Sequence, residues 1–331
     1  MIQNTMMLEI LERSEQRRTE RRRFMKAAGG AVAAAGGLSM LAACGGDDDN
    51  SVPAPTPTPA PTSSVAQIDL DVLNFALNLE YLEATFYSYA AFGSPLSTLS
   101  TSGTGTPGAV TGGRKVTFTD PVVQQYALEI AGDEVAHVNF LRAALGSQAV
   151  ALPALNIDGG ATGAFTAAAR AAGLAPATGT FDPYASDENF LLGAFIFEDV
   201  GVTAYKGASP LLVNKTYLEA AAGILAAEAY HAGLVRTVLY SKGLQTPSLR
   251  TSADAISDAR DSLDGASDLD QGITGTATRS NIVPTDTDGV AFSRSTSQVL
   301  NIVYLNNRAA SAGGFFPAGL NGNIKTSVAA V

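Results

Sequence analysis

The stretch AGDEVAHVNFLR, residues 131–142, contains one of the two histidines in this chain of 331 residues. The other histidine lies in AAEAYHAGLVR, residues 226–236. In both stretches a glutamate stands three positions before the histidine and an arginine five positions after it. A glutamate and a histidine at this spacing project from the same face of a helix. The whole histidine content of the chain therefore occurs in two copies of one helical pattern.

Apolar residues at helical spacing predict four long helices around these patterns. Asp120 and Pro121 are typical of the N-cap and first turn of the second helix. The third helix begins near Ser186, and a capping box of Thr216 with Glu219 begins the fourth. The predicted helices cover residues 69–90, 121–146, 186–207 and 216–243. Each carries one glutamate about three turns from its start: Glu80, Glu134, Glu198 and Glu228.

Helices of this length span about 33 to 40 Å, so the four glutamates can share one level of an antiparallel bundle. A second spacing agrees with a duplication, because Tyr87 follows Glu80 by seven residues. The same seven residues separate Tyr205 from Glu198. The chain therefore repeats one helical hairpin. We predict an all-α, antiparallel four-helix bundle over residues 65–243, with one long crossover.

The segments between and after these helices are richer in loop-forming residues. Residues 93–119 are expected to hold a short strand at KVTFT, 115–119. The crossover, residues 146–185, contains a predicted helix at AFTAAARAAG, 164–173. Residues 244–331 form a loop-rich C-terminal extension with one predicted amphipathic helix near STSQVLNIVYLNN, 295–307. We expect this extension to wrap the bundle, because Phe315 and Phe316 would otherwise be exposed.

Residues 1–44 are interpreted as a targeting segment and are excluded from the fold. They resemble a twin-arginine export signal, whose motif positions hold Arg21, Arg22, Phe24 and Lys26. LAAC, residues 41–44, resembles a bacterial lipobox, in which Cys44 becomes the lipidated first residue of the mature protein. The alternative is a cleaved soluble export signal with an incidental cysteine. The apolar stretch is short and weakly apolar for a permanent transmembrane helix.

Residues 45–64 are rich in proline and predict an extended linker. We expect the protein to be lipid-anchored on the periplasmic side of a bacterial cell envelope, after passing through the export machinery. The net charge of −10 and the pI near 4.7 argue against a nucleic-acid partner, because binding a polyanion requires a basic surface. No cysteine follows Cys44, so disulfides do not stabilise the bundle.

Two Glu-x-x-His pairs and two further glutamates form a ligand set for two metal ions. Four buried carboxylates would repel one another, whereas two divalent cations would neutralise them. Carboxylates and imidazoles without thiolate suit iron or manganese, and zinc is chemically possible. We expect Glu134 and His137 to hold one metal. Glu228 and His231 hold the other, and the glutamates of the first and third helices complete or bridge the pair. The predicted ligands are Glu80, Glu134, His137, Glu198, Glu228 and His231.

Other charged residues near the predicted ligands are weaker candidates. Glu83 lies around the first helix from the predicted ligand Glu80, and Glu129 lies five residues before Glu134 on the second helix. Either Glu83 or Glu129 can border the site or face solvent. Arg142 and Arg236, which follow the two histidines, are interpreted as surface residues or partners of carboxylates.

Three side chains are candidates for supporting the ligands. Tyr87 and Tyr205 either donate hydrogen bonds to ligand carboxylates or belong to the ordinary core. Asp133 stands one turn before His137 and is placed to orient its imidazole. Ala227 occupies the matching position in the second hairpin, so any such support is one-sided.

Residues 65–243 resemble the ferritin-like superfamily, and LNFALNLEYLEATFYSYA, 73–90, is similar to the first helix of its exported members. FFPAGLNGNI, 315–324, together with residues 118–145, is similar to the desiccation-related proteins of plants and bacteria. The resemblance implies a bridged di-metal centre on the six predicted ligands. The chain departs from storage ferritins in its long C-terminal tail, and from rubrerythrins because it lacks a Cys-x-x-Cys pair.

These features predict an envelope-anchored protein with two iron or two manganese ions. We expect it to act on peroxide, dioxygen or ferrous iron in protection against oxidative or desiccation stress. The alternative is a non-enzymatic structural module for desiccation or stress, with a vestigial or purely stabilising metal site. A manganese catalase is a third possibility, which differs from the first in metal and substrate preference.

Overall fold

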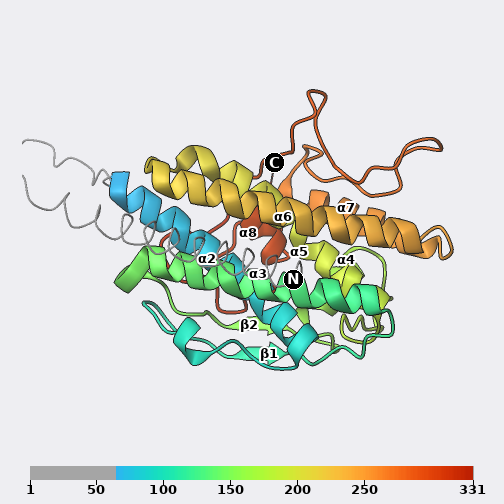
Figure 1. Cartoon of the computed structure of the whole chain (residues 1–331), viewed down its shortest axis with the longest axis horizontal. Coiled ribbons are helices and arrows are strands. Elements are labelled where there is room, and N and C mark those ends of the chain that lie inside the picture. The colour runs from blue at the N-terminus through green and yellow to red at the C-terminus, as the bar shows by residue number, and fades with distance from the viewer. Residues whose placement is uncertain (1–64, 331) are drawn as a thin grey trace, which may run out of the picture. The chain divides into compact units, whose positions relative to one another are not determined.

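Four long helices dominate the computed structural model, which describes residues 65–330 (Figure 1). They are α2 (Val65–Phe92), α3 (Pro121–Leu145), α5 (Asp187–Ala208) and α6 (Lys215–Lys242). These paired helices confirm the predicted all-α bundle. The predicted export signal, Cys44 and the proline-rich linker lie outside the described residues. Within residues 65–330, no helix combines the length and apolar character needed to cross a membrane.

The bundle consists of two antiparallel hairpins. At one end of the first hairpin, the Asn74 side chain of α2 donates to the carbonyl of Gln148, just beyond α3, at 3.1 Å. At the other end, the amide of Val116, which precedes α3, donates to the carbonyl of Ala90 at 2.9 Å. α2 and α3 therefore run in opposite directions. The short connection 209–214 joins α5 to α6 and forms the second hairpin.

The ends of the helices follow local capping chemistry. Asp120 accepts hydrogen bonds from the amides of Val122 and Val123, as expected for the N-cap of α3. The third helix was expected to begin near Ser186, and Ser186 is the N-cap of α5, which begins at Asp187. The capping box predicted at Thr216 is wrong, because Asn214 is the N-cap of α6 and accepts from the amide of Thr216. The helix therefore begins at Lys215, and Thr216 already lies inside its first turn.

The connections on one side of the bundle carry the only named strands among the described residues. β1 (Val110–Gly112) pairs in parallel with β2 (Leu155–Ile157), with Val110 opposite Leu155. The strand predicted at residues 115–119 is wrong, because this segment runs along the end of α2, where the Val116 amide is already bonded. The predicted crossover helix is confirmed as α4 (Ala164–Ala171).

The C-terminal extension contains two helices, α7 (Ser248–Asp264) and α8 (Thr296–Val303). α8 was predicted, whereas α7 was not, because its many charged and hydroxyl side chains resemble a solvated segment. α7 packs against α5, α6 and α8. Phe315 and Phe316 are buried, as predicted. Beyond them, Asn321 exchanges two hydrogen bonds of 3.0 Å with the side chain of Asn78 in α2.

Aromatic side chains fill the core beside the mid-level of the bundle. Phe86 of α2 packs against Phe190 and Phe197 of α5, with ring centroids 5.8 and 5.7 Å apart. Phe315 of the C-terminal extension packs edge to face on Phe197 at 4.9 Å. The extension therefore contributes to the same apolar core as the four long helices.

Candidate metal centre

The six predicted ligands lie together in the middle of the bundle. Nδ1 of His137 is 3.2 Å from Glu80 Oε2 and 3.7 Å from Glu228 Oε1. Nδ1 of His231 is 3.2 Å from Glu134 Oε1 and 3.6 Å from Glu198 Oε2. The four glutamates and His231 are buried, and the His137 side chain is 12% exposed. The cluster draws at least one residue from each of the four long helices.

The ligand atoms fall into two groups, each compact enough to hold one ion. The first group is Glu80, Glu134, His137 and Glu228, and the second is Glu134, Glu198 and His231. Glu134 belongs to both groups, so it is the bridging candidate. This arrangement differs from the expectation that Glu228 and His231 share one ion. His137 stays in one group with Glu134, as expected, whereas Glu228 joins that group and leaves His231 with Glu134 and Glu198.

The free polar atoms of the cluster fit metal binding. Within residues 65–330, eight buried ligand atoms have no hydrogen-bond partner. They are Glu80 Oε2, both oxygens of Glu134, His137 Nδ1, Glu198 Oε2, both oxygens of Glu228 and His231 Nδ1. A buried carboxylate oxygen without a partner carries a large desolvation cost, which a bound cation removes. The donor set of carboxylate oxygens and imidazole nitrogens suits iron or manganese.

Two tyrosines support the cluster from opposite hairpins. Tyr87 of α2 donates its hydroxyl to Glu198 Oε1 in α5. Tyr205 of α5 donates its hydroxyl to Glu80 Oε1 in α2. Of the two interpretations of these residues, the structure selects hydrogen-bond donors to ligand carboxylates. Each bond occupies one oxygen of its glutamate and leaves the other oxygen directed at the histidines.

Burial and the neighbouring charges shift the pKa values of the ionisable side chains in the cluster. Burial raises the pKa of Glu80 to about 7 and that of Glu198 to about 8. Burial also pushes the pKa of Glu134 upward, but the two imidazoles outweigh it and lower this pKa to about 2. Burial opposes the protonation of His137, yet the neighbouring carboxylates raise its pKa to about 11. Because a ligating imidazole must be neutral, metal binding releases these protons.

Glu83 lies beside the cluster without joining either ligand group. It is buried, and burial together with the surrounding carboxylates raises its pKa well above the usual range. Gly201 of α5 makes room here, because a Cβ at this position would collide with Glu228 Oε2 and lie 3.4 Å from Glu83 Oε1. Glu83 is therefore an inner neighbour of the cluster, whereas the other weak candidate, Glu129, is exposed and also outside both groups.

The expected role of Asp133 is corrected by the structure. Its carboxylate lies 3.3 Å from Nε2 of His231, not beside His137. Asp133 is exposed at the α3–α6 side of the bundle, whereas the His137 imidazole turns inward toward the glutamates. His231 therefore has an acidic partner on its outer nitrogen. Ala227 occupies the equivalent position on α6 and offers no carboxylate to His137. The support is therefore one-sided, as expected, but it acts on His231 and not on His137.

The two arginines that follow the histidines behave differently. Arg142 was interpreted as a surface or carboxylate-pairing residue, but it is half-buried and donates to Tyr81 Oη at 2.6 Å and to the Ser102 carbonyl. Arg236 is fully buried and pairs with Asp199 at 2.7 Å, which confirms the carboxylate-pairing alternative. Arg142 thus ties α2 to a loop, and Arg236 leads into a larger network.

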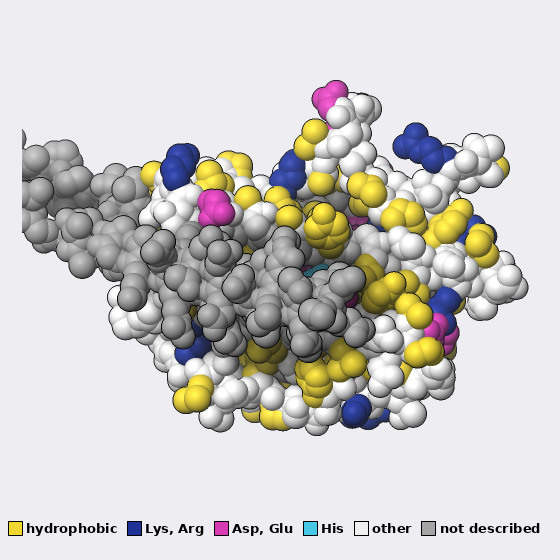
Figure 2. Space-filling model, in the orientation of Figure 1, with side chains coloured by type: hydrophobic (Ala, Val, Ile, Leu, Met, Phe, Trp, Pro, Cys, Tyr) yellow, Lys and Arg dark blue, Asp and Glu magenta, His cyan; other side chains and the backbone are white. Residues whose placement is uncertain are grey.

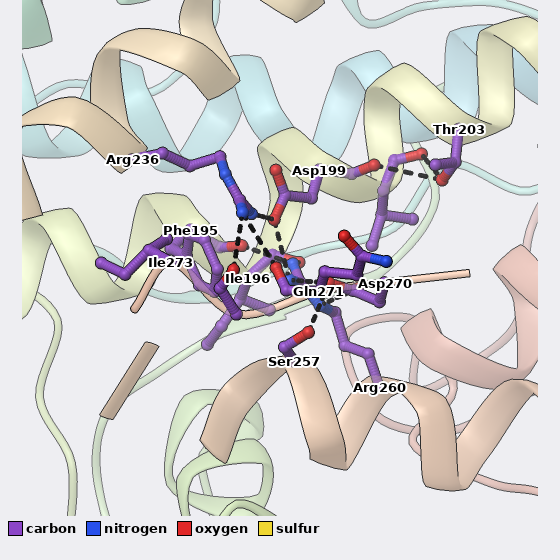
Figure 3. A network of polar contacts seen from close by, with 12 residues as sticks. Phe195, Ile196, Asp199, Thr203, Arg236, Ser257, Arg260, Asp270, Gln271 and Ile273 are labelled. Atoms are coloured by element: carbon purple, nitrogen blue, oxygen red, sulfur yellow. Dashed lines mark hydrogen bonds and ion pairs between the residues drawn. The ribbon is translucent and has the colours of Figure 1, made fainter. Parts of the chain in front are cut away.

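A buried network of ion pairs lies next to the cluster and was not predicted (Figure 3). Arg260 of α7 contacts Asp199 at 2.9 Å and Asp270 at 2.7 Å, and it donates to the carbonyl of Phe195. Arg294 pairs with Asp264 and Asp270. Asp199 directly follows the ligand Glu198, so the network fixes α5 at the level of the cluster. The one signal in the sequence was an aspartate inside the apolar run FIFEDVGV, 195–202.

The family model of the ferritin-like domain matches residues 68–241. The chain belongs to the ferritin-like family. The matched range includes all six residues of the cluster and nearly the full length of the four long helices. It confirms the resemblance inferred from the sequence.

Two curated relatives of this ferritin-like chain have distinct names. The ferritin-like catalase Nec2 of Nesocodon mauritianus is 27% identical over 275 residues, which cover 80% of this chain and 86% of the relative. The desiccation-related protein PCC13-62 of Craterostigma plantagineum is 31% identical over 179 residues, which cover 54% of this chain and 55% of the relative. The chain thus spans about half of the second relative. No solved structure matches.

Proposed function

We propose that this ferritin-like protein holds two iron or two manganese ions at the buried cluster and decomposes peroxide in protection against oxidative or desiccation stress. The observation that carries the proposal is the set of eight buried atoms without a hydrogen-bond partner, arranged in two groups around the shared carboxylate of Glu134. The catalase name of one relative supports peroxide as the substrate.

In this proposal the first ion is held by Glu80, Glu134, His137 and Glu228, and the second by Glu134, Glu198 and His231. Iron or manganese supplies reversible electron transfer there, so that one hydrogen peroxide is oxidised to dioxygen and another is reduced to two waters.

The protein's own residues orient the ligands and hold protons. The hydroxyls of Tyr87 and Tyr205 fix one oxygen of a ligand carboxylate each. Burial and neighbouring carboxylates raise the pKa of both tyrosines well above the usual range, so both hydroxyls stay protonated and keep donating. Glu83, whose pKa is raised in the same way, keeps a proton on its carboxyl beside Glu228.

Metal analysis and peroxide turnover test the proposal together. The protein, expressed without its signal segment, should contain about two iron or manganese ions per chain. It should evolve oxygen from hydrogen peroxide. Glu134→Gln should lose both ions, because both groups share this carboxylate. Glu129→Gln, one turn earlier on the same helix and exposed, should keep both the metal and the turnover. Wild-type protein without bound iron or manganese would contradict the proposal.

A second candidate is a structural module for desiccation, which the name of the second relative favours. Such a module would use bound metal only to stabilise the bundle. Full metal occupancy without oxygen evolution, combined with a melting temperature that falls when the metal is removed, would favour the module over the catalase.

We further propose that the chain is lipid-anchored at Cys44 on the periplasmic side of a bacterial envelope. The support comes from the sequence alone: the twin-arginine pattern, LAAC at 41–44, and the proline-rich linker that follows. Radiolabelled palmitate should enter the full-length wild type and not Cys44→Ala. Absence of label from both proteins would leave the cleaved soluble signal as the remaining interpretation.

A further inference from the structure

An open groove of about 940 Å³ lies between α3 and α6. Asp133 and Ile130 of α3 line one side, and His231 of α6 lies in the groove. Ile282 and Val283 of the C-terminal extension also line it. Figure 2 shows the molecule in the orientation of Figure 1, with a small patch of histidine colour near its middle. The volume falls in the range of small-molecule sites, and one of the proposed metal ligands borders it.

The lining favours some solutes over others. Ala226, Ala227, Ala229 and Gly233 present small surfaces, and neither lysine nor arginine is among the described residues that line the groove. The acidic members Glu129 and Asp133 are both exposed. Apart from His231, the charged side chains among the described residues of the lining are acidic, and they attract divalent cations, while a neutral molecule such as hydrogen peroxide enters without an electrostatic penalty.

The C-terminal wall of the groove is held in place by Arg236. Its guanidinium donates to the Ile282 carbonyl at 2.9 Å and to the Asn281 carbonyl at 2.6 Å. The same group is anchored on Asp199 at 2.7 Å. Arg236 is fully buried, so these bonds are protected from water. The wall is therefore a fixed part of the fold, connected to the helix that carries Glu198.

Gly233 keeps the groove wide at the turn that follows His231. It lies inside α6, where glycine costs about 1 kcal/mol relative to alanine. A Cβ added at Gly233 would meet nothing within 4 Å, so a side chain there would fill the groove without a clash. Gly223, on the same helix, has the same open space around the position that a Cβ would take, but it does not line the groove.

We propose that the α3–α6 groove is the entrance through which divalent cations and hydrogen peroxide reach the cluster, with the loop at Asn281–Val283 as its outer wall. This inference rests on the proposed metal-dependent function. It assigns to the C-terminal extension a part in access to the site, in addition to its packing.

The rate of metal uptake tests the entrance without reference to turnover. Metal-free protein is mixed with manganese(II), and the paramagnetic resonance signal of the free aqueous ion is followed. Gly233→Trp should take up the same final amount of manganese at least about tenfold more slowly, because the groove must first open around the indole. Gly223→Trp should match the wild type. The kcat/KM for hydrogen peroxide should fall in Gly233→Trp alone.

A second variant tests whether the outer wall of the groove also limits metal uptake. Val283→Trp should also slow manganese uptake, and Val290→Trp, an exposed valine of the same loop region that does not line the groove, should not. Val283 is 71% exposed, so its replacement leaves the core intact.

The outcomes separate the two proposals. Equal uptake rates in Gly233→Trp and Gly223→Trp, with normal final metal content, would overturn the entrance and leave the metal centre standing. A wild type that takes up no metal would overturn both proposals.

Discussion

The hydroxyl of Tyr205 donates a hydrogen bond to the carboxylate of the predicted ligand Glu80, 125 residues away in the sequence and on the other hairpin. The bond from Tyr87 to Glu198 repeats this relationship in the opposite direction. Each hairpin thus orients a glutamate of the other. Because the exchange is reciprocal, correct placement of the ligands depends on the two hairpins being docked on each other.

Removing either hydroxyl should weaken metal binding without unfolding the protein. Tyr205→Phe keeps the packing and deletes a hydrogen bond to a charged group, which is worth about 1.5 to 3 kcal/mol. We expect metal affinity to fall about 10- to 100-fold, and Tyr87→Phe to behave alike. Competition with a metal-binding dye measures the affinity. Tyr81→Phe is the control, because its hydroxyl bonds Val150 and Arg142 outside the cluster. A loss of affinity in all three variants would point to a general packing defect instead.

Asp133 should make the two metal positions unequal. Its carboxylate orients only His231, so Asp133→Ala should weaken one of the two ions by about 10- to 100-fold and spare the other. Titration calorimetry should then resolve two affinities. Glu129→Ala, an exposed acid one turn earlier, serves as the control. Equal weakening of both ions would show that Asp133 acts through the overall charge of the groove and not through His231.

The buried network should hold the C-terminal extension on the bundle. Arg260→Met leaves Asp199 and Asp270 without a cationic partner on α7, and breaking a buried pair in this way costs about 3 to 5 kcal/mol. Urea denaturation should show the loss, and limited proteolysis should cut the extension sooner. Arg279→Met makes the same replacement at an exposed position and should be neutral. Unchanged stability of Arg260→Met would mean that the apolar contacts of α7 suffice.

Asp261 should lower stability at neutral and higher pH. Burial, together with Asp270 and Asp264, raises its pKa from 3.8 to about 7, and its Oδ1 has no hydrogen-bond partner. A raised pKa in the folded state means that stability is greatest below pH 3.8 and falls as the pH rises through 7.

Asp261→Asn should therefore raise the melting temperature above pH 7 and have little effect near pH 4. Because the side chain is only partly buried, solvent screening reduces the gain to about 1 kcal/mol, or about 2 to 4 °C. Asp258→Asn makes the same replacement at an exposed position of the same helix and is the matched control. Equal gains for Asp261→Asn at pH 4 and pH 8 would mean that charge at this position is not the cause.

The bundle and the convergence of its six central residues could be predicted, because helical periodicity and the repeated Glu-x-x-His spacing are local properties of the sequence. Contacts across helices could not. Which histidine Asp133 contacts depends on the offset of α3 relative to α6 along their axes. The residues next to Asp133 in the sequence do not determine this offset. The grouping of Glu228 with His137 in place of His231 likewise depends on contacts between helices.

Helix α7 was missed for a related reason. Arg260 and Asp264 look like solvent-exposed charges in the sequence, yet they are buried because Asp199, Asp270 and Arg294 meet them from distant segments. A pattern based on hydrophobicity assigns such residues to the surface. The cap at Asn214 was overlooked because Thr216 and Glu219 offered a competing signal two residues later.

The hydrogen bonds between Asn78 and Asn321 impose an order on biosynthesis. The two residues are 243 positions apart, so at about 5 to 20 residues per second the ribosome needs on the order of ten to fifty seconds to supply the second after the first. Until then, the first helix lacks its final partner and the surface that Phe315 and Phe316 cover is open to water. The first helix therefore reaches its final packing only after the segment around Asn321 has been synthesised.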